Sequence, residues 1–348
     1  MDFIKMVESP SDDPAISIIV PVKNVSGTIR DLLDSLMKLD YNRNNLEIIV
    51  VDGNSKDGTK KIVEEYPVTL AEEEGRGLNA ARNTGIRLSK GEIIAFTDGD
   101  CIVPPDWAKS IVDNFNDPYV GFVGGPVKGY DKDGFLSEYI DETFLHAKPG
   151  FRERKEATDL SLLQFPAGCN MAFRRHSLEK INFFDERIYY GFDDLYPVEQ
   201  LGSRGFRIVL DPDVFVWHQH RRTLWAVLKQ HFNYGRGGAL LMIYKRASRL
   251  GRWFTTYLFT TILAISLFMM MAAMGLILEH MLPIQFMTGL GLGAYMLAIA
   301  FYIKKARKSH SLLKLTLYPA LDFTRGLFFT LGGIAQFFKT ILGERPQD

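Results

Sequence analysis

The sequence predicts an α/β protein: a mostly parallel sheet with helices on both faces, followed by apolar helices that cross a membrane. Two observations support this fold class. Between residues 15 and about 222, short apolar runs alternate with segments of helical spacing, which is the order of a parallel sheet covered by helices. Beyond residue 255, two long runs contain no Asp, Glu, Lys, Arg or His, as expected of membrane-spanning helices.

The first part of the chain supplies the sheet. Apolar runs predict strands at 15–21, 46–51, 67–71 and 93–97. Apolar residues at helical spacing predict intervening helices at 28–39, 59–66 and 78–89. Sheets of this kind bind ligands beyond the carboxyl ends of their strands, where the strand order reverses. We therefore expect one site to form from the polar loops after three of these strands, at 22–27, 52–58 and 98–105.

The composition limits the function and the compartment. The 348 residues are enough for one large domain and an additional part. A formal net charge of +0 excludes the global basic field of a nucleic-acid-binding protein. The cysteines, Cys101 and Cys169, are too few for a disulfide framework and lack metal-site spacing, so we expect reduced, partly buried thiols. The polar, acidic segment 1–14 has no signal-peptide core, so we expect it to stay in the cytoplasm.

The most informative short segment is Asp98-Gly99-Asp100, which follows the apolar strand predicted at 93–97. Residues two apart in an extended chain point the same way. Asp98 and Asp100 can then converge on Mg²⁺ or Mn²⁺ beside a diphosphate, because these cations prefer oxygen ligands. Gly99 would let a ligand approach the backbone. The alternative is an ordinary turn, since Asp-Gly is a common turn dipeptide.

A second acidic residue, Asp52, ends the strand predicted at 46–51. At that position its carboxylate can bond a ribose or a base. The alternative is a turn that leads into a helix capped by Asp57 or Thr59.

The segment 75–80 matches a dinucleotide-binding glycine pattern, but only weakly. Three glutamates precede it and would repel a pyrophosphate. We interpret the segment as a loop and the start of a helix, with Arg76 or Arg82 facing the nucleotide.

Adjacent carboxylates at Asp193 and Asp194 precede a helix predicted at 195–203. Paired carboxylates beside aromatic residues can have raised and split pKa values, which suits a general base that takes a proton from a hydroxyl. The alternative is an acidic cap for the helix, which accounts for one of the two residues.

A histidine pair follows apolar runs at 206–210 and 214–216. His218 and His220 share one side of an extended chain, so either can complete a metal site with Asp100. The alternative for each is a structural histidine.

Arginines cluster between the histidines and the apolar helices. They can neutralise a leaving diphosphate or meet anionic lipid head groups. We expect the last of them in a loop at 234–237. The cluster consists of Arg221, Arg222 and Arg236.

The C-terminal part is predicted to anchor the chain in a membrane. The runs 256–278 and 281–303 are each long enough to span it. Cations in the segment 238–255 precede the first run and others follow the second, so the positive-inside rule predicts a hairpin with both ends in the cytoplasm. The apolar tail 312–342 forms either a third span with a charge pair inside or helices in the membrane interface. The charged pair in this tail is Asp322 and Arg325.

Together these segments resemble a family 2 glycosyltransferase with a GT-A fold, of the membrane-anchored, non-processive type. Gly53 departs from the pattern, because the family often has a second Asp there. The stretch 230–234 does not match the Gln-x-x-Arg-Trp sequence of processive synthases. The expected catalytic domain is 15–237, and the matching segments occur in the family's order: 19–24, 50–52 with 55–59, 81–85, 98–100, 168–171 and 192–194.

The resemblance implies roles for individual residues. Asp52 contacts the nucleoside and Asp98 lies near the ribose. Asp100 holds the divalent metal on the diphosphate. Asp194 is the catalytic base, with Asp193 as the acidic residue before it. By the same resemblance the nucleotide-sugar site also includes Pro21, Val22, Asn24 and Arg82.

We therefore predict an inverting transferase that moves a sugar from a nucleotide-diphosphate sugar to a hydroxyl of a lipid-linked acceptor. It would work at the cytoplasmic face of the cell membrane with Mg²⁺ or Mn²⁺ as cofactor. Two alternatives stay open. A glycosyl-phosphopolyprenol synthase would use the same site with a phosphate oxygen as nucleophile and need little or no general base. A non-catalytic nucleotide-sugar-binding membrane protein would show no turnover.

Overall fold

The computed structural model describes residues 14–130, 134–143, 152–159, 167–277, 282–309 and 311–343. Most of the predicted N-terminal segment 1–14 therefore lies outside the described residues. The described chain divides into two compact units. The first unit runs to residue 130 and also contains 152–159 and 167–220, whereas the second contains 134–143 and the chain from 221 onward.

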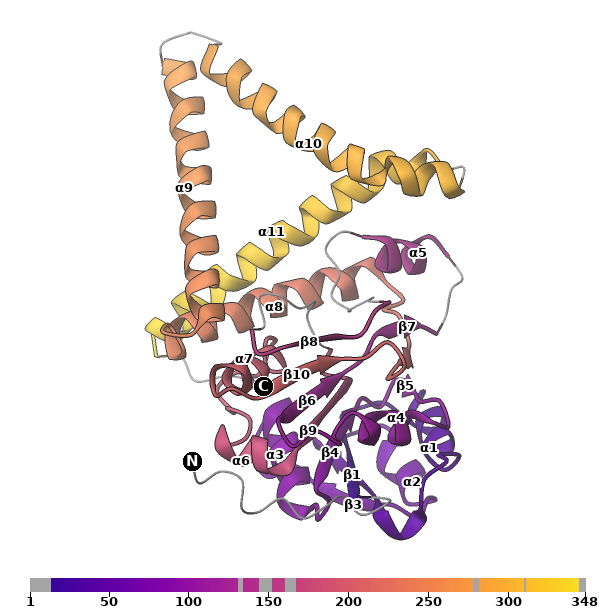
Figure 1. Cartoon of the computed structure of the whole chain (residues 1–348). Helices are drawn as coiled ribbons and strands as arrows, with labels where there is room; N and C mark the ends of the chain where they lie inside the picture. Colours follow the sequence, from indigo (N-terminus) through magenta and orange to yellow (C-terminus); the bar gives the residue numbers. More distant parts are fainter. Residues whose placement is uncertain are drawn as a thin grey trace. The chain divides into compact units, whose positions relative to one another are not determined.

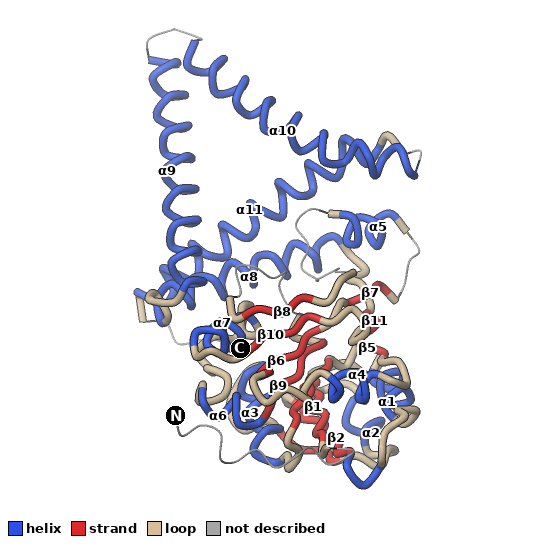
Figure 2. Tube along the Cα trace, viewed as in Figure 1, coloured by secondary structure: helices blue, strands red, loops and turns tan. Residues whose placement is uncertain are grey.

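The first unit is built on an eight-stranded sheet with the strand order β3-β2-β1-β4-β9-β6-β10-β8. Parallel pairing joins β3, β2, β1 and β4, whereas β9 pairs antiparallel with both of its neighbours. Figure 2 shows the strands of the sheet against the helices. The strands are β1 (Ile16–Val22), β2 (Leu46–Asp52), β3 (Thr69–Glu72), β4 (Ile93–Thr97), β6 (Val120–Gly124), β8 (Lys155–Ala157), β9 (Asn170–Arg174) and β10 (Arg207–Leu210).

Helices cover both faces of this sheet, as predicted (Figure 1). Side chains alternate along β1, so Ile18 faces a core that includes Leu32 of α1. Ile19 faces the other way against α3, where a Cβ on Gly85 would lie 2.4 Å from Ile19 Cγ2. The helices of this unit are α1 (Ile29–Leu36), α2 (Thr59–Val63), α3 (Leu78–Leu88), α4 (Trp107–Asp113), α6 (Arg175–Lys180) and α7 (Leu195–Ser203), with a short 3₁₀ turn at Arg43–Asn45.

The strand order reverses at β1. The chain passes from β1 to β2 and β3 on one side and then returns to β4 on the other side. The loops after β1, β2 and β4 therefore open at the same edge of the sheet, as the sequence predicts. A small second sheet adjoins this loop region through Cys101, which follows the loop after β4. Its strands, in spatial order, are β5 (Cys101–Ile102), β11 (Val216–His218) and β7 (Val127–Gly129).

The second unit is helical. Among the described residues, one stretch, Arg249–Gly275 in α9, is long and apolar enough to cross a membrane. The second predicted span contains a shorter apolar stretch, Thr288–Ile303 in α10. The tail forms a single helix, α11, with Pro319 inside it. The helices of this unit are α5 (Phe135–Glu142), α8 (Leu224–Tyr244), α9 (Arg249–Ile277), α10 (Leu282–Ser309) and α11 (Leu313–Ile341).

The loop predicted at 234–237 is wrong, because these residues lie inside α8. Glycine there serves close helix packing rather than a turn. A Cβ on Gly235 would lie 1.8 Å from the carbonyl oxygen of Phe329 in α11, and one on Gly332 would lie 1.9 Å from the carbonyl oxygen of Phe232. Small residues allow such close contact between helix backbones. The helical unit contains 134–143 and the chain from 221 onward, so two parts of the catalytic domain predicted at 15–237 belong to it.

Asp322 and Arg325, considered as a pair inside a third span, lie 3.6 Å apart and are both buried. Whether this tail spans the membrane or lies in its interface stays a prediction. Tyr139 of α5 donates a 2.8 Å hydrogen bond to the Asp322 carboxylate. Arg325 donates to the phenol oxygen of Tyr139 and to Nε2 of His231. A polar cluster therefore joins α5, α8 and α11.

Candidate active site

Asp52 lies at the carboxyl end of β2, opposite Val22 of β1. Its Oδ2 accepts a 2.9 Å hydrogen bond from the backbone N–H of Ser55 and lies 3.6 Å from Nζ of Lys60. Its Oδ1 is buried and has no hydrogen-bond partner among the described residues. Buried polar atoms in native proteins are normally paired. Oδ1 is therefore an acceptor available to a ligand.

The N-cap position of α2 is held by Gly58, and the carboxylate that bonds to the start of this helix is Asp57 rather than Asp52. Asp57 Oδ1 accepts the backbone N–H of Thr59, the first residue of α2. This hydrogen bonding lowers the pKa of Asp57, chiefly through the Thr59 hydroxyl. Asp52 therefore remains free of any capping role.

Glu73 is a candidate residue that sequence reasoning missed. Its backbone N–H donates to the carbonyl of Asp52, and a Cβ on Gly53 would lie 2.8 Å from Glu73 Oε2. The Glu73 carboxyl thus occupies the space that a side chain at residue 53 would fill. Burial raises the pKa of Glu73. The sequence does contain a signal for Glu73, because it lies one residue after β3. Ligands bind beyond the carboxyl ends of such strands, which is the reason for expecting the site in the loops after β1, β2 and β4.

Pro21, Val22 and Asn24 lie at the end of β1 and in the loop after it. Asn24 has a positive φ of 54°. Its N–H donates to Ser55 Oγ at 2.9 Å, and its Oδ1 accepts the N–H of Lys56 at 2.7 Å. The structure therefore shows Asn24 joining the loops after β1 and β2. A contact between Asn24 and the nucleotide stays a prediction.

The structure brings Asp98, Asp100 and His218 together. One potential ligand atom from each lies within 4.8 Å of the other two, and His218 Nε2 is 3.3 Å from Asp100 Oδ1. The carboxylates converge through a turn, because the N–H of Cys101 bonds to the carbonyl of Asp98 at 3.0 Å. The extended conformation predicted for this segment is therefore wrong. The turn considered as an alternative is therefore present, and metal binding by Asp98 and Asp100 stays a prediction.

The orientation of His218 suits metal binding. Nδ1 lies 2.6 Å from the carbonyl oxygen of Gln219, so Nδ1 carries the proton and donates it. Nε2 faces Asp100, and in the neutral imidazole its lone pair is the one that can bond to a cation. Two electron-rich atoms 3.3 Å apart are favourable when a cation lies between them. Metal-bound histidines usually donate their other N–H to a carbonyl or carboxylate in this way. The residues present therefore fit a divalent cation.

Gly99 allows the loop after β1 to pack closely against the turn. A Cβ at this position would lie 2.9 Å from Val25 Cγ2 and 3.1 Å from Val22 Cγ1. The missing side chain therefore makes room for the loop after β1, and the approach of a ligand to this backbone stays a prediction. Thr28 holds the same loop in place by donating to the Gly99 carbonyl at 2.8 Å.

Arg82, Asp193 and Asp194 form a second charged group. The guanidinium of Arg82 is buried and donates from Nη1 to Asp193 and to Asn79. Asp194 occupies the N-cap position of α7 but makes no side-chain cap hydrogen bond. Its Oδ2 instead accepts the backbone N–H of Gly168 at 2.8 Å. The capping role considered for this pair is therefore wrong for Asp194.

Asp194 has the electrostatics of a base. Burial, and then the negative charge of Asp193, raises the pKa of Asp194 to about 7, while Arg82 acts in the opposite direction. General bases work best with a pKa near the working pH.

Phe192, just before the pair, has a φ of 61°, a conformation that is rare for aromatic residues and concentrates at functional sites.

Two arginines that the sequence predicts to bind the nucleotide sugar belong to the second compact unit. Arg222 is exposed, and Arg236 donates from Nε to Gln336 Oε1 at 2.9 Å. A contact between either arginine and a diphosphate stays a prediction. His220 is buried, and among the described residues it belongs to neither group of potential metal ligands.

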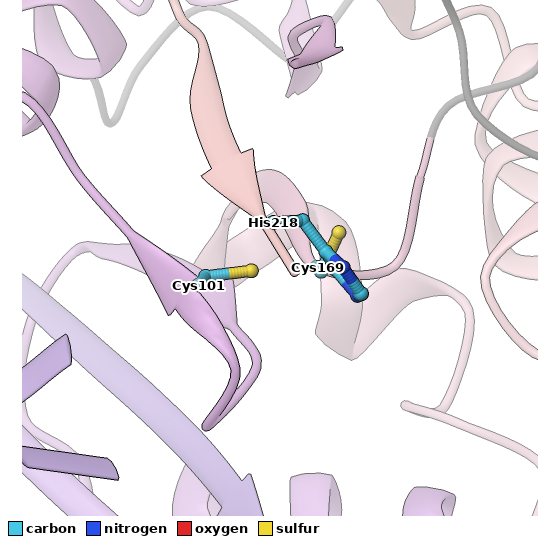
Figure 3. A group of neighbouring side chains, drawn as sticks. All are labelled: Cys101, Cys169 and His218. Carbon is cyan, nitrogen blue, oxygen red and sulfur yellow. The ribbon is translucent and has the colours of Figure 1, made fainter. Parts of the chain in front are cut away.

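The cysteines differ from the expectation. Both are buried rather than partly buried, and each offers its sulfur within 4.8 Å of a ring nitrogen of His218 (Figure 3). The sequence does not predict the proximity of the two cysteines to His218, because Cys169 lies beside β9 while Cys101 and His218 lie on the small sheet.

Known proteins resemble this chain in sequence and in fold. A family model described as glycosyl transferase family 2 matches residues 17–182. Glycosyltransferase AglE of Haloferax volcanii is 30% identical over 243 residues, which cover 68% of this chain and 76% of AglE. The uncharacterized glycosyltransferase EpsJ of Bacillus subtilis is 26% identical over 223 residues, which cover 62% of this chain and 64% of EpsJ.

Solved structures show the same fold. The mannosyltransferase PcManGT from Pyrobaculum calidifontis, in complex with GDP-Man and Mn²⁺, has a TM-score of 0.59 and is 22% identical. The match covers 98% of this chain and 91% of that one. TarS 1-349 of S. aureus has a TM-score of 0.51 at 18% identity, with 96% of this chain and 93% of that chain covered.

Proposed function

The chain belongs to glycosyltransferase family 2 and is a glycosyltransferase with the predicted GT-A fold, and on that premise we propose a specific reaction. It moves a sugar from a nucleotide-diphosphate sugar to a hydroxyl of a lipid-linked acceptor, with inversion at the anomeric carbon. The observation that carries this proposal is the placement of Asp194, whose carboxylate is held by Gly168 beside the Asp193–Arg82 pair.

The nucleoside end of the donor is assigned to Asp52 and Glu73. Asp52 Oδ1 and Glu73 Oε1 are buried acceptors that have no hydrogen-bond partner among the described residues. The ribose hydroxyls and the base N–H groups of a nucleoside are donors of matching polarity. A bound nucleoside would thus relieve the cost of leaving two buried oxygens unpaired.

The diphosphate end is assigned to the group of Asp98, Asp100 and His218. These residues would hold Mg²⁺ or Mn²⁺, and the bound cation would offset the negative charge of the departing diphosphate. His218 is kept in the ligand tautomer by the Gln219 carbonyl.

Asp194 takes the proton from the acceptor hydroxyl. With a pKa near neutrality, its carboxylate is a stronger base than an ordinary aspartate, is about half ionised at pH 7 and is largely ionised at higher pH. The hydroxyl oxygen then attacks the anomeric carbon from the side opposite the diphosphate, which inverts the configuration. Arg82 acts indirectly by holding Asp193, because its guanidinium is buried in that ion pair.

The acceptor is assigned to the membrane. The apolar stretch in α9 supports an anchored enzyme. The cations on either side of the apolar runs support a hairpin through α9 and α10 that leaves the catalytic unit in the cytoplasm. A polyprenyl-linked saccharide presents its hydroxyl at that face, so the anchor keeps enzyme and acceptor at the same surface.

The test is a donor screen by nucleotide release, with membranes that contain the full chain. Each nucleotide-diphosphate sugar is supplied with Mn²⁺ or Mg²⁺, alone, with polyprenyl phosphate, or with a polyprenyl-linked saccharide. We expect release that requires the divalent cation and the lipid-linked saccharide. Solubilised enzyme that glycosylates a free sugar equally well, and never a lipid-linked one, would contradict the assigned acceptor.

The same assay separates hydroxyl transfer from transfer to a phosphate. Asp194→Asn should nearly abolish turnover when a hydroxyl attacks, because the base is lost. A phosphate oxygen is already ionised and needs little or no base. Turnover with polyprenyl phosphate that survives Asp194→Asn would therefore identify a glycosyl-phosphopolyprenol synthase instead.

A further inference from the structure

A second group of possible metal ligands adjoins the first and shares one residue with it. Cys101, Cys169 and His218 each offer one ligand atom, and the three atoms lie within 4.8 Å of one another (Figure 3). A zinc ion bonded at about 2.3 Å to sulfur and about 2.0 Å to nitrogen holds its tetrahedral ligands about 3.3–3.8 Å apart. A bound zinc ion would draw the three atoms from within 4.8 Å of one another to that closer spacing.

The backbone holds the three residues in fixed relative positions. Cys101 and His218 are direct partners in the antiparallel pairing of β5 with β11. Cys169 precedes Asn170, whose buried side chain bonds to Trp107 and to the carbonyls of Pro126 and Val214. The cysteines and the histidine are thus all attached to hydrogen-bonded elements. Such preorganisation lowers the cost of assembling a metal site.

The two groups differ in the cations they favour. Carboxylate oxygens suit Mg²⁺ and Mn²⁺, whereas thiolates and imidazole select Zn²⁺ and similar thiophilic ions. Three protein ligands, with water or another group in the fourth position, are sufficient for zinc. The Cys101–Cys169–His218 group is therefore suited to a different cation from the one assigned to Asp98 and Asp100.

His218 can serve one group at a time. Its Nδ1 donates to the Gln219 carbonyl at 2.6 Å, so Nε2 is the nitrogen whose lone pair can bond to a cation. Nε2 is also the atom that faces Asp100 at 3.3 Å. A cation held by the two sulfurs would draw this lone pair away from the carboxylates, and its charge would oppose a second cation close by.

We propose that Cys101, Cys169 and His218 form a site for Zn²⁺ or another thiophilic divalent cation, and that its occupancy inhibits the transferase by withdrawing His218 from Asp98 and Asp100. Each thiol releases its proton to solvent as its sulfur bonds to the cation, and no electron is transferred. Cation binding by these three residues does not depend on the proposed function, whereas the inhibition rests on the proposed metal-dependent transfer.

The competing explanation is that the cysteines are inert core residues. Both belong to the buried apolar cluster of the first unit, and buried free cysteines commonly behave as small apolar side chains. This explanation predicts that neither sulfur reaches a metal in the folded protein.

The binding test uses Co²⁺ as a spectroscopic substitute for Zn²⁺ in the full, metal-free chain. We expect an intense sulfur-to-cobalt charge-transfer band in the wild type and in Asp100→Asn, and its removal by Zn²⁺. Cys101→Ala, Cys169→Ala and Cys169→Ser should each weaken cobalt binding by at least about tenfold, because a ligand matters at least as much as the groups that orient it. A folded wild type without the band would overturn the proposal.

The activity test measures whether Zn²⁺ competes with Mn²⁺ in nucleotide release. Zn²⁺ should inhibit the wild type, and excess Mn²⁺ should relieve the inhibition. Cys169→Ser, which keeps the carboxylates and His218, should retain turnover with Mn²⁺ and need at least about tenfold more Zn²⁺ for inhibition. Equal zinc sensitivity in Cys169→Ser would overturn the inhibitory role. A cobalt band without any transferase turnover would instead count against the proposed function alone.

Discussion

The backbone N–H of Gly168 donates a 2.8 Å hydrogen bond to Oδ2 of Asp194, 26 residues further along the chain. The carboxylate is therefore positioned by a turn beside β9 and not by the helix that it precedes. The contact leaves little space. A Cβ on Gly168 would lie 2.7 Å from Arg82 Nη2 and 3.2 Å from Asp194 Oδ2.

Gly168→Ala should slow turnover with little effect on donor affinity. The added methyl group must displace Arg82 or Asp194, and a misplacement of about 1 Å in a catalytic group can cost about 10²-fold in rate. Steady-state kinetics would separate kcat from the KM for the donor. Gly326→Ala is the matched control, because a Cβ there meets nothing within 4 Å. Unchanged kcat in a folded Gly168→Ala enzyme would show that this contact does not position the base.

The pH dependence of the rate should report Asp194. A general base must be ionised, so kcat/KM should fall about tenfold per pH unit below the pKa of about 7. Asp194→Asn should remove this acid limb of the pH profile, in which kcat/KM falls with pH, and lower the rate by about 10²–10⁴-fold.

Arg82→Gln should move the same limb to higher pH. Arg82 holds the pKa of Asp194 down, in opposition to burial and Asp193. Profiles of kcat/KM against pH for the wild type and this variant provide the measurement. A limb that stays in place, or moves to lower pH, would assign the titration to another group.

The sheet and its site edge could be predicted because their signals are local. The apolar run at 93–97 becomes β4 without change, and the helix predicted at 195–203 becomes α7 with the same bounds. Asp52 and Asp98 were found through their positions at strand ends. Those positions follow from the alternation of strands and helices alone.

The remaining features depend on contacts between distant segments. Strand β5 has two residues, too few for periodicity to reveal the pairing that places Cys101 opposite His218. Glycine at 235 indicated a loop because glycine is unfavourable in isolated helices. Contact with the backbone of α11 outweighs that preference. The run of three glutamates at 72–74 indicates repulsion of a pyrophosphate, because the sequence does not show that the Glu73 carboxyl lies beside Gly53.

Glu73→Gln should change the preference for the base of the donor. The carboxyl lies beside Gly53, one residue after Asp52, so it is placed to accept from a base N–H. An amide of the same size can donate as well as accept. We expect KM for the best nucleotide sugar to rise about tenfold, the cost of one hydrogen bond.

A competition assay with several free nucleotides would measure this change directly. Glu74→Gln is the matched control, because Glu74 is exposed and pairs with Arg87 at 2.9 Å. An unchanged order of nucleotide affinities in Glu73→Gln would exclude Glu73 from base recognition.

The polar cluster of the helical unit should lose stability in acid through His231. Nδ1 of His231 donates to the Val227 carbonyl, and Nε2 accepts from Arg325. Burial, and then the charge of Arg325, lowers the pKa of His231 from 6.5 to about 4. The unfolded state therefore takes up a proton first as the pH falls. The contribution of neutral His231 to the stability of the folded protein is therefore intact above pH 6.5 and is lost progressively toward pH 4.

Thermal unfolding of the detergent-solubilised chain between pH 7.5 and 4.5 tests this sign. His231→Gln keeps an acceptor for Arg325 but cannot titrate, so its midpoint should fall less steeply with acid than that of the wild type. The expected difference in the free energy of unfolding between the two proteins is about 1.4 kcal/mol per pH unit below 6.5, the value of one pKa unit. His176→Gln is the control, because His176 is exposed and pairs only loosely with Glu179 at 3.8 Å. Parallel acid profiles for the wild type and His231→Gln would mean that His231 is protonated in the folded protein, and Arg325 would then have to release Nε2 in acid.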